Sequence, residues 1–251
     1  MTIKPKIRAF IIILFSAALL LLIFSSCGNP IINHMLGDDI EVPSSVFYAD
    51  DLSGLIDYIN NNRAGHTVLN PLTIQFLGSD GSDGDYLKIQ NELNNNIHKI
   101  TGIVYLNLDM RGMSGNQIPD YYFSGEIRET DIPYNILLSK CKIVSIQFPN
   151  SAQKIGENAF SLNSDIESVS MPGVTTIGEL AFYKAYFLNE LFMPEKPPTT
   201  KQYSFYGIIS GKIVIHVPAN IANTNRDAYR IWIDKYYLNT EYVNAYILAD
   251  Q

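Results

Sequence analysis

Two segments of the chain place apolar and polar residues in nearly the same order, 22 residues apart. Ile-Gly-Glu-Asn-Ala-Phe at 155–160 returns as Ile-Gly-Glu-Leu-Ala-Phe at 177–182. Each copy is followed by an apolar ladder, apolar-x-x-apolar-x-apolar-Pro, at 166–172 and 188–194. The last two apolar positions of a ladder share one face of a short strand, and the proline ends that strand. A period of this length predicts stacked coils, in which each coil covers the apolar side of its neighbour.

Further copies of the ladder extend the repeat in both directions. Three such ladders lie at residues 103–108, 143–149 and 212–218. In the last of them Lys212 stands at the first apolar position. Ile118 and Phe123 keep the five-residue spacing of isoleucine and phenylalanine in the clear copies. Thr200 stands where the last copy is expected to have its isoleucine. Eroded copies around a clear centre are typical of a stacked array whose ends are capped.

One interval in the repeat is too long. From Phe123 to the next ladder at Ile143 the chain runs 14 residues further than the corresponding step in the later copies. We therefore expect an insertion within 124–142, and about five coils over residues 102–218.

These motifs resemble the BspA-type leucine-rich repeats of bacterial surface proteins, with their Ile-Gly-x-x-Ala-Phe signature and Leu-x-x-Val-x-Leu-Pro strand. The likeness covers residues 102–218 and is strongest over 143–194; Val217-Pro218-Ala219, followed by Tyr229 and Trp232, also resembles the terminal segment of that family. The resemblance implies an α/β fold built as a short, right-handed leucine-rich repeat solenoid. It also implies a protein of the cell surface that adheres or binds other proteins.

The segment before the repeats predicts a small α/β cap over residues 47–101. Asp50 or Asp51 is expected to cap its first helix and Asp83 or Asp85 its second; the expected elements are a helix over 51–62, a strand over 71–77 and a helix over 86–93. Such a unit would cover the apolar end and the strand edge of the first coil. The alternative is an independent binding domain.

The segment after the repeats, residues 219–251, predicts a helical cap. A helix is expected to begin near Ala228, and four tyrosines follow it, at positions 236, 237, 242 and 246. These aromatic side chains either close the last coil or form an exposed patch that meets a ligand or a membrane.

The first residues of the chain predict an export signal. Three basic residues precede a run without charge from Ala9 to Phe24, which is shorter than the roughly 20 residues of a membrane span. Small residues then lead to Cys27, so residues 1–26 resemble a bacterial lipoprotein signal peptide and residues 27–46 a flexible tether. We expect lipidation of Cys27, which would hold the protein on a membrane by acyl chains. Ordinary cleavage nearby and an uncleaved anchor are the alternatives.

Charge narrows the class of partner. Without residues 1–26 the chain keeps 15 basic against 25 acidic side chains, a net charge of −10. Nucleic acids and anionic headgroups both require a cationic surface, so we expect no nucleic acid partner. Cys141 is the only other cysteine, so no disulfide framework is expected and Cys141 is interpreted as a partly buried turn residue.

The sequence offers little evidence for catalysis, metal binding or cofactor binding. Asp80, Asp83 and Asp85 offer oxygen ligands, but their spacing is not that of a calcium loop. The four histidines are far apart and no Cys-x-x-Cys pair is present, which disfavours zinc. The chain has no nucleophile elbow, phosphate loop or dinucleotide fingerprint. We therefore expect that the protein is not an enzyme and that it has no cofactor and no metal site.

The candidate binding face follows from the ladder frame, because residues between the buried apolar positions point to solvent. One column holds Asn107, Gln147, Ser170, Phe192 and His216, and the other holds Tyr105, Ser145, Ser168, Glu190 and Val214. Columns on adjacent strands about 4.8 Å apart would form one rigid patch, in which aromatic side chains supply most of the contact energy. A merely solvated sheet face is the alternative.

The sequence therefore predicts an exported, lipid-anchored protein of the cell envelope, at the outer membrane or cell surface, that binds a protein or matrix ligand through this face. The alternative is a structural protein that binds carbohydrate or an envelope polymer without catalysis.

Overall fold

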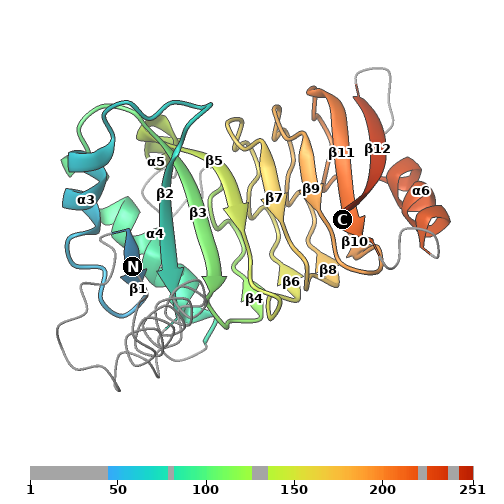
Figure 1. The fold of residues 1–251 in the computed structure, drawn as a ribbon, viewed down its shortest axis with the longest axis horizontal. Helices are drawn as coiled ribbons and strands as arrows, with labels where there is room; N and C mark the ends of the chain where they lie inside the picture. The colour runs from blue at the N-terminus through green and yellow to red at the C-terminus, as the bar shows by residue number, and fades with distance from the viewer. Residues whose placement is uncertain (1–44, 79–81, 126–134, 220–224, 237–242, 251) are drawn as a thin grey trace, which may run out of the picture. The chain divides into compact units, whose positions relative to one another are not determined.

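The computed structural model describes residues 45–78, 82–125, 135–219, 225–236 and 243–250. These residues form an α/β fold with two parallel sheets and few helices, as the sequence predicts (Figure 1). The large sheet has the order β1-β2-β3-β5-β7-β9-β11-β12. Its strands are β1 (Val46–Tyr48), β2 (Leu72–Leu77), β3 (Val104–Gly112), β5 (Cys141–Gln147), β7 (Ser168–Ser170), β9 (Glu190–Phe192), β11 (Gly211–Pro218) and β12 (Val243–Asp250).

The small sheet is formed at the Ile-Gly steps of the two clear repeats and at the corresponding positions of the repeats on either side, and has the order β10-β8-β6-β4. Its strands are β4 (Gln117–Ile118), β6 (Lys154–Ile155), β8 (Thr176–Ile177) and β10 (Thr199–Thr200). Each repeat thus crosses the large sheet once and the small sheet once, which keeps every pairing parallel.

The core lies between the two sheets. The ladder residues Val169, Met171 and Leu191 point into it from the large sheet, and Ile155 and Ile177 point into it from the small one; all five are fully buried. The phenylalanine that closes each Ala-Phe motif is buried in the same layer. The spacing of apolar residues therefore selects the strands, since each strand turns its alternate side chains inward.

Glycine in the Ile-Gly step is required by close packing of one repeat on the next. A Cβ on Gly178 would lie 2.5 Å from the carbonyl carbon and oxygen of Gly156, and a Cβ on Gly156 would lie 2.5 Å from the backbone nitrogen of Asp120. Real Cβ atoms do not approach backbone this closely, so the motif needs a residue without a side chain.

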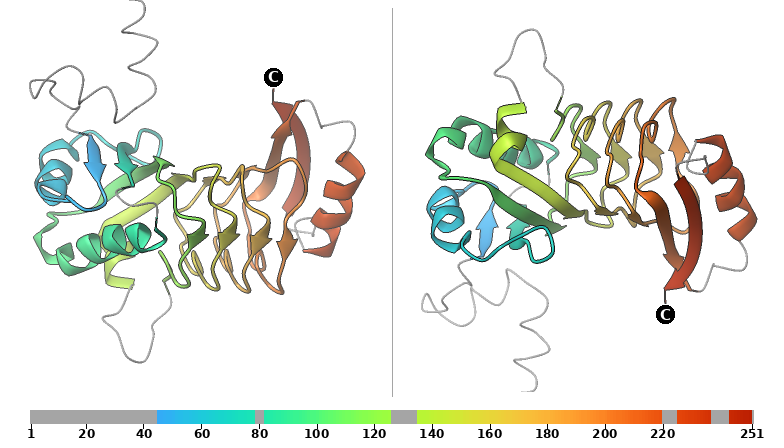
Figure 2. Two further views of the ribbon diagram at one scale, coloured as in Figure 1. Left: turned by 90° about the horizontal axis from the view of Figure 1, so that it is seen from below. Right: turned by 90° about the horizontal axis from the view of Figure 1, so that it is seen from above.

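Helices lie at both ends of the sheets (Figure 1). At the amino-terminal end are α3 (Leu55–Asn62), α4 (Gly84–Asn95), the 3-10 turn η1 (Ile97–Lys99) and α5 (Asn135–Lys140). At the other end α6 (Arg226–Lys235) lies beyond β10, as Figure 2 shows for the red helix next to the row of short strands. The insertion expected within 124–142 contains α5, while residues 126–134 lie outside the described residues.

The expected helix caps are wrong. Helix α3 begins after Gly54, whose φ of 79° is left-handed, and no side chain caps it; Asp51 instead accepts hydrogen bonds from the backbone and hydroxyl of Ser53. Asp83 precedes α4, but its carboxylate accepts from the backbone N–H groups of Asn116 and Gln117. Asp83 therefore makes a tertiary contact in place of the expected contact with the first turn of α4.

Six strands were not expected: β4, β6, β8 and β10 of the small sheet, and β1 and β12 at the two edges of the large sheet. Val46, placed in the tether by the sequence, begins β1 and pairs with Gln75 of β2. Residues 243–250, placed in a helical segment, form β12 and pair with the whole of β11. Ile103 is also corrected: it is 55% exposed, and Val104 takes the buried place at the start of β3.

A candidate binding face on the large sheet

Side chains that point away from the core form two rows across the large sheet, because the register aligns them strand by strand. The first row is Thr73, Asn107, Ser145, Ser168, Glu190, Val214 and Tyr246. The second row is Gln75, Asp109, Gln147, Ser170, Phe192, His216 and Leu248. We call the surface formed by these two rows the sheet face.

The register of β3 differs from the expected columns. Pairing with β5 steps from Leu106–Ile143 to Asn107–Ser145, which leaves Val144 as an extra residue. Asn107 therefore belongs beside Ser145 rather than Gln147, and Tyr105 lies opposite Lys142, outside both rows. A bulge of this kind changes the pairing without changing the period of the apolar residues, so the ladder spacing alone did not predict it.

The end of the sheet face on β3 and β5 is polar and internally bonded. The Ser145 hydroxyl donates to Asn107 Oδ1 at 2.6 Å. Arg111 holds Asp109 through Nε at 2.9 Å and Nη2 at 2.7 Å. Burial alone would raise the pKa of Asp109, but the hydrogen bonds and charge of Arg111 outweigh it, so the pKa lies below its usual range. These polar groups are already paired within the protein.

The end of the sheet face on β9, β11 and β12 is apolar. The Phe192 and His216 rings stack with centroids 4.1 Å apart and planes 10° apart. Leu248 continues this row and is 50% exposed; Tyr246 in the other row is 52% exposed. Lys212 Nζ lies 5.5 Å from the centre of the Tyr246 ring, a cation–π distance. Exposed aromatic side chains are enriched among the residues that anchor protein partners.

Acidic side chains lie at the border of the apolar end, where β9 adjoins β7. Glu190 belongs to β9, and Glu167 directly precedes β7. Burial raises the pKa of Glu167 first, and the charges of Asp165 and Glu190 raise it further. Asp165 is paired with Lys142 at 2.9 Å. Among the described residues neither Glu167 nor Glu190 forms a salt bridge.

All ten residues predicted for binding lie on strands of the large sheet, and nine of them belong to the two rows. Val214 is only 8% exposed, because Tyr246 and Glu190 stand on the strands at either side of it. Sequence reasoning did not place Thr73, Gln75, Asp109, Tyr246 or Leu248 on this face; Tyr246 was expected in the helical cap. Tyr246 and Leu248 alternate with Ala245 and Ile247, which pack against the core, and this alternation is the pattern that could have revealed β12.

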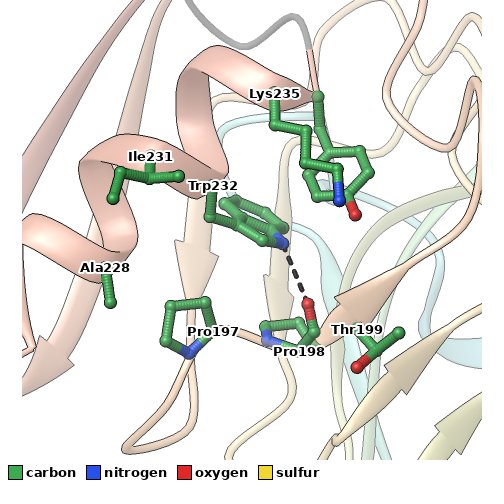
Figure 3. A pocket seen from close by; sticks show the side chains of 8 residues that line it. Pro197, Pro198, Thr199, Ala228, Ile231, Trp232 and Lys235 are labelled. Atoms are coloured by element: carbon green, nitrogen blue, oxygen red, sulfur yellow. Dashed lines mark hydrogen bonds between the residues drawn. The ribbon is translucent and has the colours of Figure 1, made fainter.

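A shallow cavity of about 400 Å³ lies between α6 and the strand β10. Figure 3 shows its lining, with Trp232 at the centre; the residues are Pro197, Pro198, Thr199, Ala228, Ile231, Trp232, Lys235 and Tyr236. Trp232 Nε1 donates to the Pro198 carbonyl at 3.1 Å and to Thr200 Oγ1 at 3.0 Å. The tryptophan is thus engaged in holding the helix against the sheet rather than presented to a ligand.

The other candidate chemistry is used structurally or lies outside the described residues. Asp85 is paired with Lys88 at 2.7 Å, and Asp80 lies outside the described residues. In the part of the chain that the structure describes, no group of acidic, histidine and cysteine side chains is arranged to hold a metal. Cys141 is fully buried as the first residue of β5, so it is a strand residue rather than a turn residue. Cys27, the expected signal peptide and most of the expected tether lie outside the described residues.

Comparison with known proteins bears on the repeats. The family model described as BspA type leucine rich repeat region matches residues 130–231 in 6 copies. No curated protein and no solved structure matches the chain significantly. None of the described helices combines the length and apolar character needed to cross a membrane.

Proposed function

Residues 130–231 are a BspA-type leucine-rich repeat region, and from this premise we propose that the protein is an exported, lipid-anchored protein-binding or adhesion module of the bacterial cell envelope. Its repeats form a short solenoid of about five coils, closed by an α/β segment at one end and by α6 at the other. Proteins of this architecture bind through extended surfaces rather than through deep catalytic pockets.

The observation that carries the proposal is the apolar end of the sheet face. Phe192, His216, Tyr246 and Leu248 stand side by side on three adjacent strands, and the two on β12 are half exposed. Exposing them to water is unfavourable by about 25 cal/mol for each Å² of apolar surface, which a partner would recover. Rigid strands also fix their positions before binding, so little conformational entropy is lost on association.

Photo-crosslinking tests the protein-binding function. A benzophenone amino acid replaces Phe192 on the sheet face, and in a matched control it replaces Phe187, which is 54% exposed but lies outside the two rows. We expect a polypeptide adduct on intact cells or with envelope material for position 192 and none for position 187. Equal labelling at both positions, or none at either, would contradict the proposal.

The lipid anchor needs a separate experiment. We expect labelled fatty acid to be incorporated into the wild-type protein and not into Cys27→Ala, and globomycin to block processing. Protease digestion of intact cells then tests exposure at the surface. A carbohydrate-binding role remains the alternative: signal on a glycan array, with no adduct at position 192, would favour it.

A further inference from the structure

Some carboxylates on and beside the sheet face are paired with a basic side chain, and others form no salt bridge within the described residues. At its polar end Asp109 is neutralised by Arg111, with a carboxylate–guanidinium distance of 2.7 Å. Beside β5 and β7, Lys142 neutralises Asp165. Glu167 and Glu190 form no salt bridge within the described residues, so the uncompensated negative charge is concentrated where β7 meets β9.

These two carboxylates repel each other in a partly desolvated place. Glu190 and Asp165 both raise the pKa of Glu167, in addition to the effect of burial. A cation brought in by a partner would reduce this repulsion, and its interaction would be stronger than in open water because the site is partly buried. The protein as a whole carries a net charge of −7, which attracts a cationic partner at long range.

The acidic spot lies directly beside the apolar end of the sheet face. Glu190 and Phe192 are two residues apart on β9, and both point outward. Residues two apart on a strand are separated by about 6.6 Å. An extended peptide has the same spacing between alternate side chains, so a cationic residue and an aromatic residue at positions i and i+2 would meet Glu190 and Phe192 together.

We propose that the sheet face over β7, β9, β11 and β12 binds an extended polypeptide segment of the pattern Lys/Arg-x-aromatic. The cation lies between Glu167 and Glu190, and the aromatic ring lies against the stacked pair of Phe192 and His216. Tyr246 and Leu248 extend the apolar contact on the outer strand. This inference rests on the proposed function and names the chemistry of the partner for the same face.

Binding of synthetic peptides tests the inference. Four fluorescently labelled Gly/Ser peptides carry at their centre Lys-x-Phe, Lys-x-Ser, Glu-x-Phe or Ser-x-Phe, and fluorescence polarisation measures each dissociation constant. We expect Lys-x-Phe to bind at least about tenfold more tightly than the other three, and its affinity to fall with added salt. A dissociation constant for Lys-x-Phe weaker than about 1 mM would overturn the inference.

Matched variants separate a local site from general attraction to an acidic protein. Glu190→Gln and Phe192→Ala should each weaken binding of Lys-x-Phe about tenfold, whereas Glu195→Gln, which makes the same charge change at an exposed position between β9 and β10, should leave binding unchanged. An equal loss for Glu195→Gln would show non-specific attraction and overturn the inference. Circular dichroism of each variant checks that it is folded.

The outcome is distinguishable from failure of the proposed function. A polypeptide adduct at position 192 together with no preference for Lys-x-Phe would contradict this inference but would still support the protein-binding role. Binding of a neutral oligosaccharide to the same face, lost in Phe192→Ala, sinks both.

Discussion

The rings of Phe160 and Phe182 stack face to face, with centroids 5.2 Å apart and planes 12° apart. Phe205 stacks on the other side of Phe182 at the same 5.2 Å distance, with planes 11° apart. One ring from each of three successive repeats therefore forms a continuous column through the core, and the central ring has an aromatic partner on both faces. Removing the Phe182 ring should lower stability by more than its lost buried area accounts for, because both neighbouring rings lose a stacking partner.

We expect Phe182→Ala to lower the free energy of unfolding by about 3–5 kcal/mol, as measured by urea denaturation. Phe187→Ala is the control within the same repeat, since its side chain is 54% exposed; it should change stability by less than about 0.5 kcal/mol. Similar losses in the two variants would contradict the column as the stabilising feature.

Close packing at the Ile-Gly step gives a second expectation. Gly178→Ala places a methyl group 2.5 Å from the Gly156 carbonyl, so the backbone of two repeats must shift. We expect a loss of about 2–3 kcal/mol. Gly84→Ala is the comparison, because its added Cβ would meet only the Ser82 hydroxyl, at 3.3 Å. A thermal melt of both variants decides the matter, and equal melting temperatures would refute the packing argument.

Trp232 fastens α6 to the last repeat by hydrogen bonds as well as by packing. Trp232→Phe keeps most of the aromatic surface and removes the donor to the Pro198 carbonyl and to Thr200 Oγ1. We expect a loss of about 1–3 kcal/mol, because a buried acceptor is left with fewer partners. In a double-mutant cycle with Thr200→Val the two losses should not add, with a coupling of about 1 kcal/mol. Strict additivity would show that packing alone holds the helix.

Glu167 should make stability depend on pH. Its pKa is raised in the folded protein, by burial first and then by Asp165 and Glu190, so folding disfavours its ionised form. The contribution of Glu167 to stability is therefore fully present below the ordinary glutamate pKa and is lost as pH rises through the folded value.

Glu167→Gln should consequently be more stable than the wild-type protein at neutral pH, and the difference should vanish in acid. Urea denaturation across pH measures it. The gain should be smaller in a Glu190→Gln background, where one of the repelling charges is already absent. A gain that persists unchanged at low pH would contradict this origin.

Cys141 should resist thiol reagents. It is fully buried, and burial raises the pKa of its thiol to about 12, so the reactive thiolate is scarce at neutral pH. In Cys27→Ser, where Cys141 is the only cysteine, Ellman's reagent should react slowly with the native protein and with one equivalent in denaturant. Rapid labelling of the native protein would show that β5 opens readily.

The sequence was informative where the repeat imposes a period. The ladder residues predicted the strands of the central repeats, whereas the short strands of the small sheet were not predicted. The Asn158, Leu180 and Tyr203 backbones take the left-handed conformation at the same place in successive repeats, with φ between 52° and 55°. None of the three is glycine, so glycine positions could not reveal this turn, and of the three only Asn158 is of a type that often adopts it.

The sequence was less informative where tertiary contacts replace local ones. Val144 is an extra residue in the pairing of β5 with β3, and only the neighbouring strand reveals it. The tyrosine-rich end of the chain was interpreted as helical, and β12 forms there because β11 offers it a complete edge. The two half-exposed residues of the candidate face on β12 were missed for this reason.

The column of stacked rings ends at Trp232, whose ring plane is turned away from the planes of the other rings. Trp232 meets Phe205 at 5.4 Å, but its plane is turned by 75° rather than by 11°. The indole thus occupies the place where the ring of a further repeat would stack, in an orientation on which no further ring can continue. A chain that stopped before α6 would present a bare phenylalanine and the open edge of β10, which invite a second molecule to attach end to end. Trp232 therefore caps the column and, with α6, covers the end of the array that would otherwise be open.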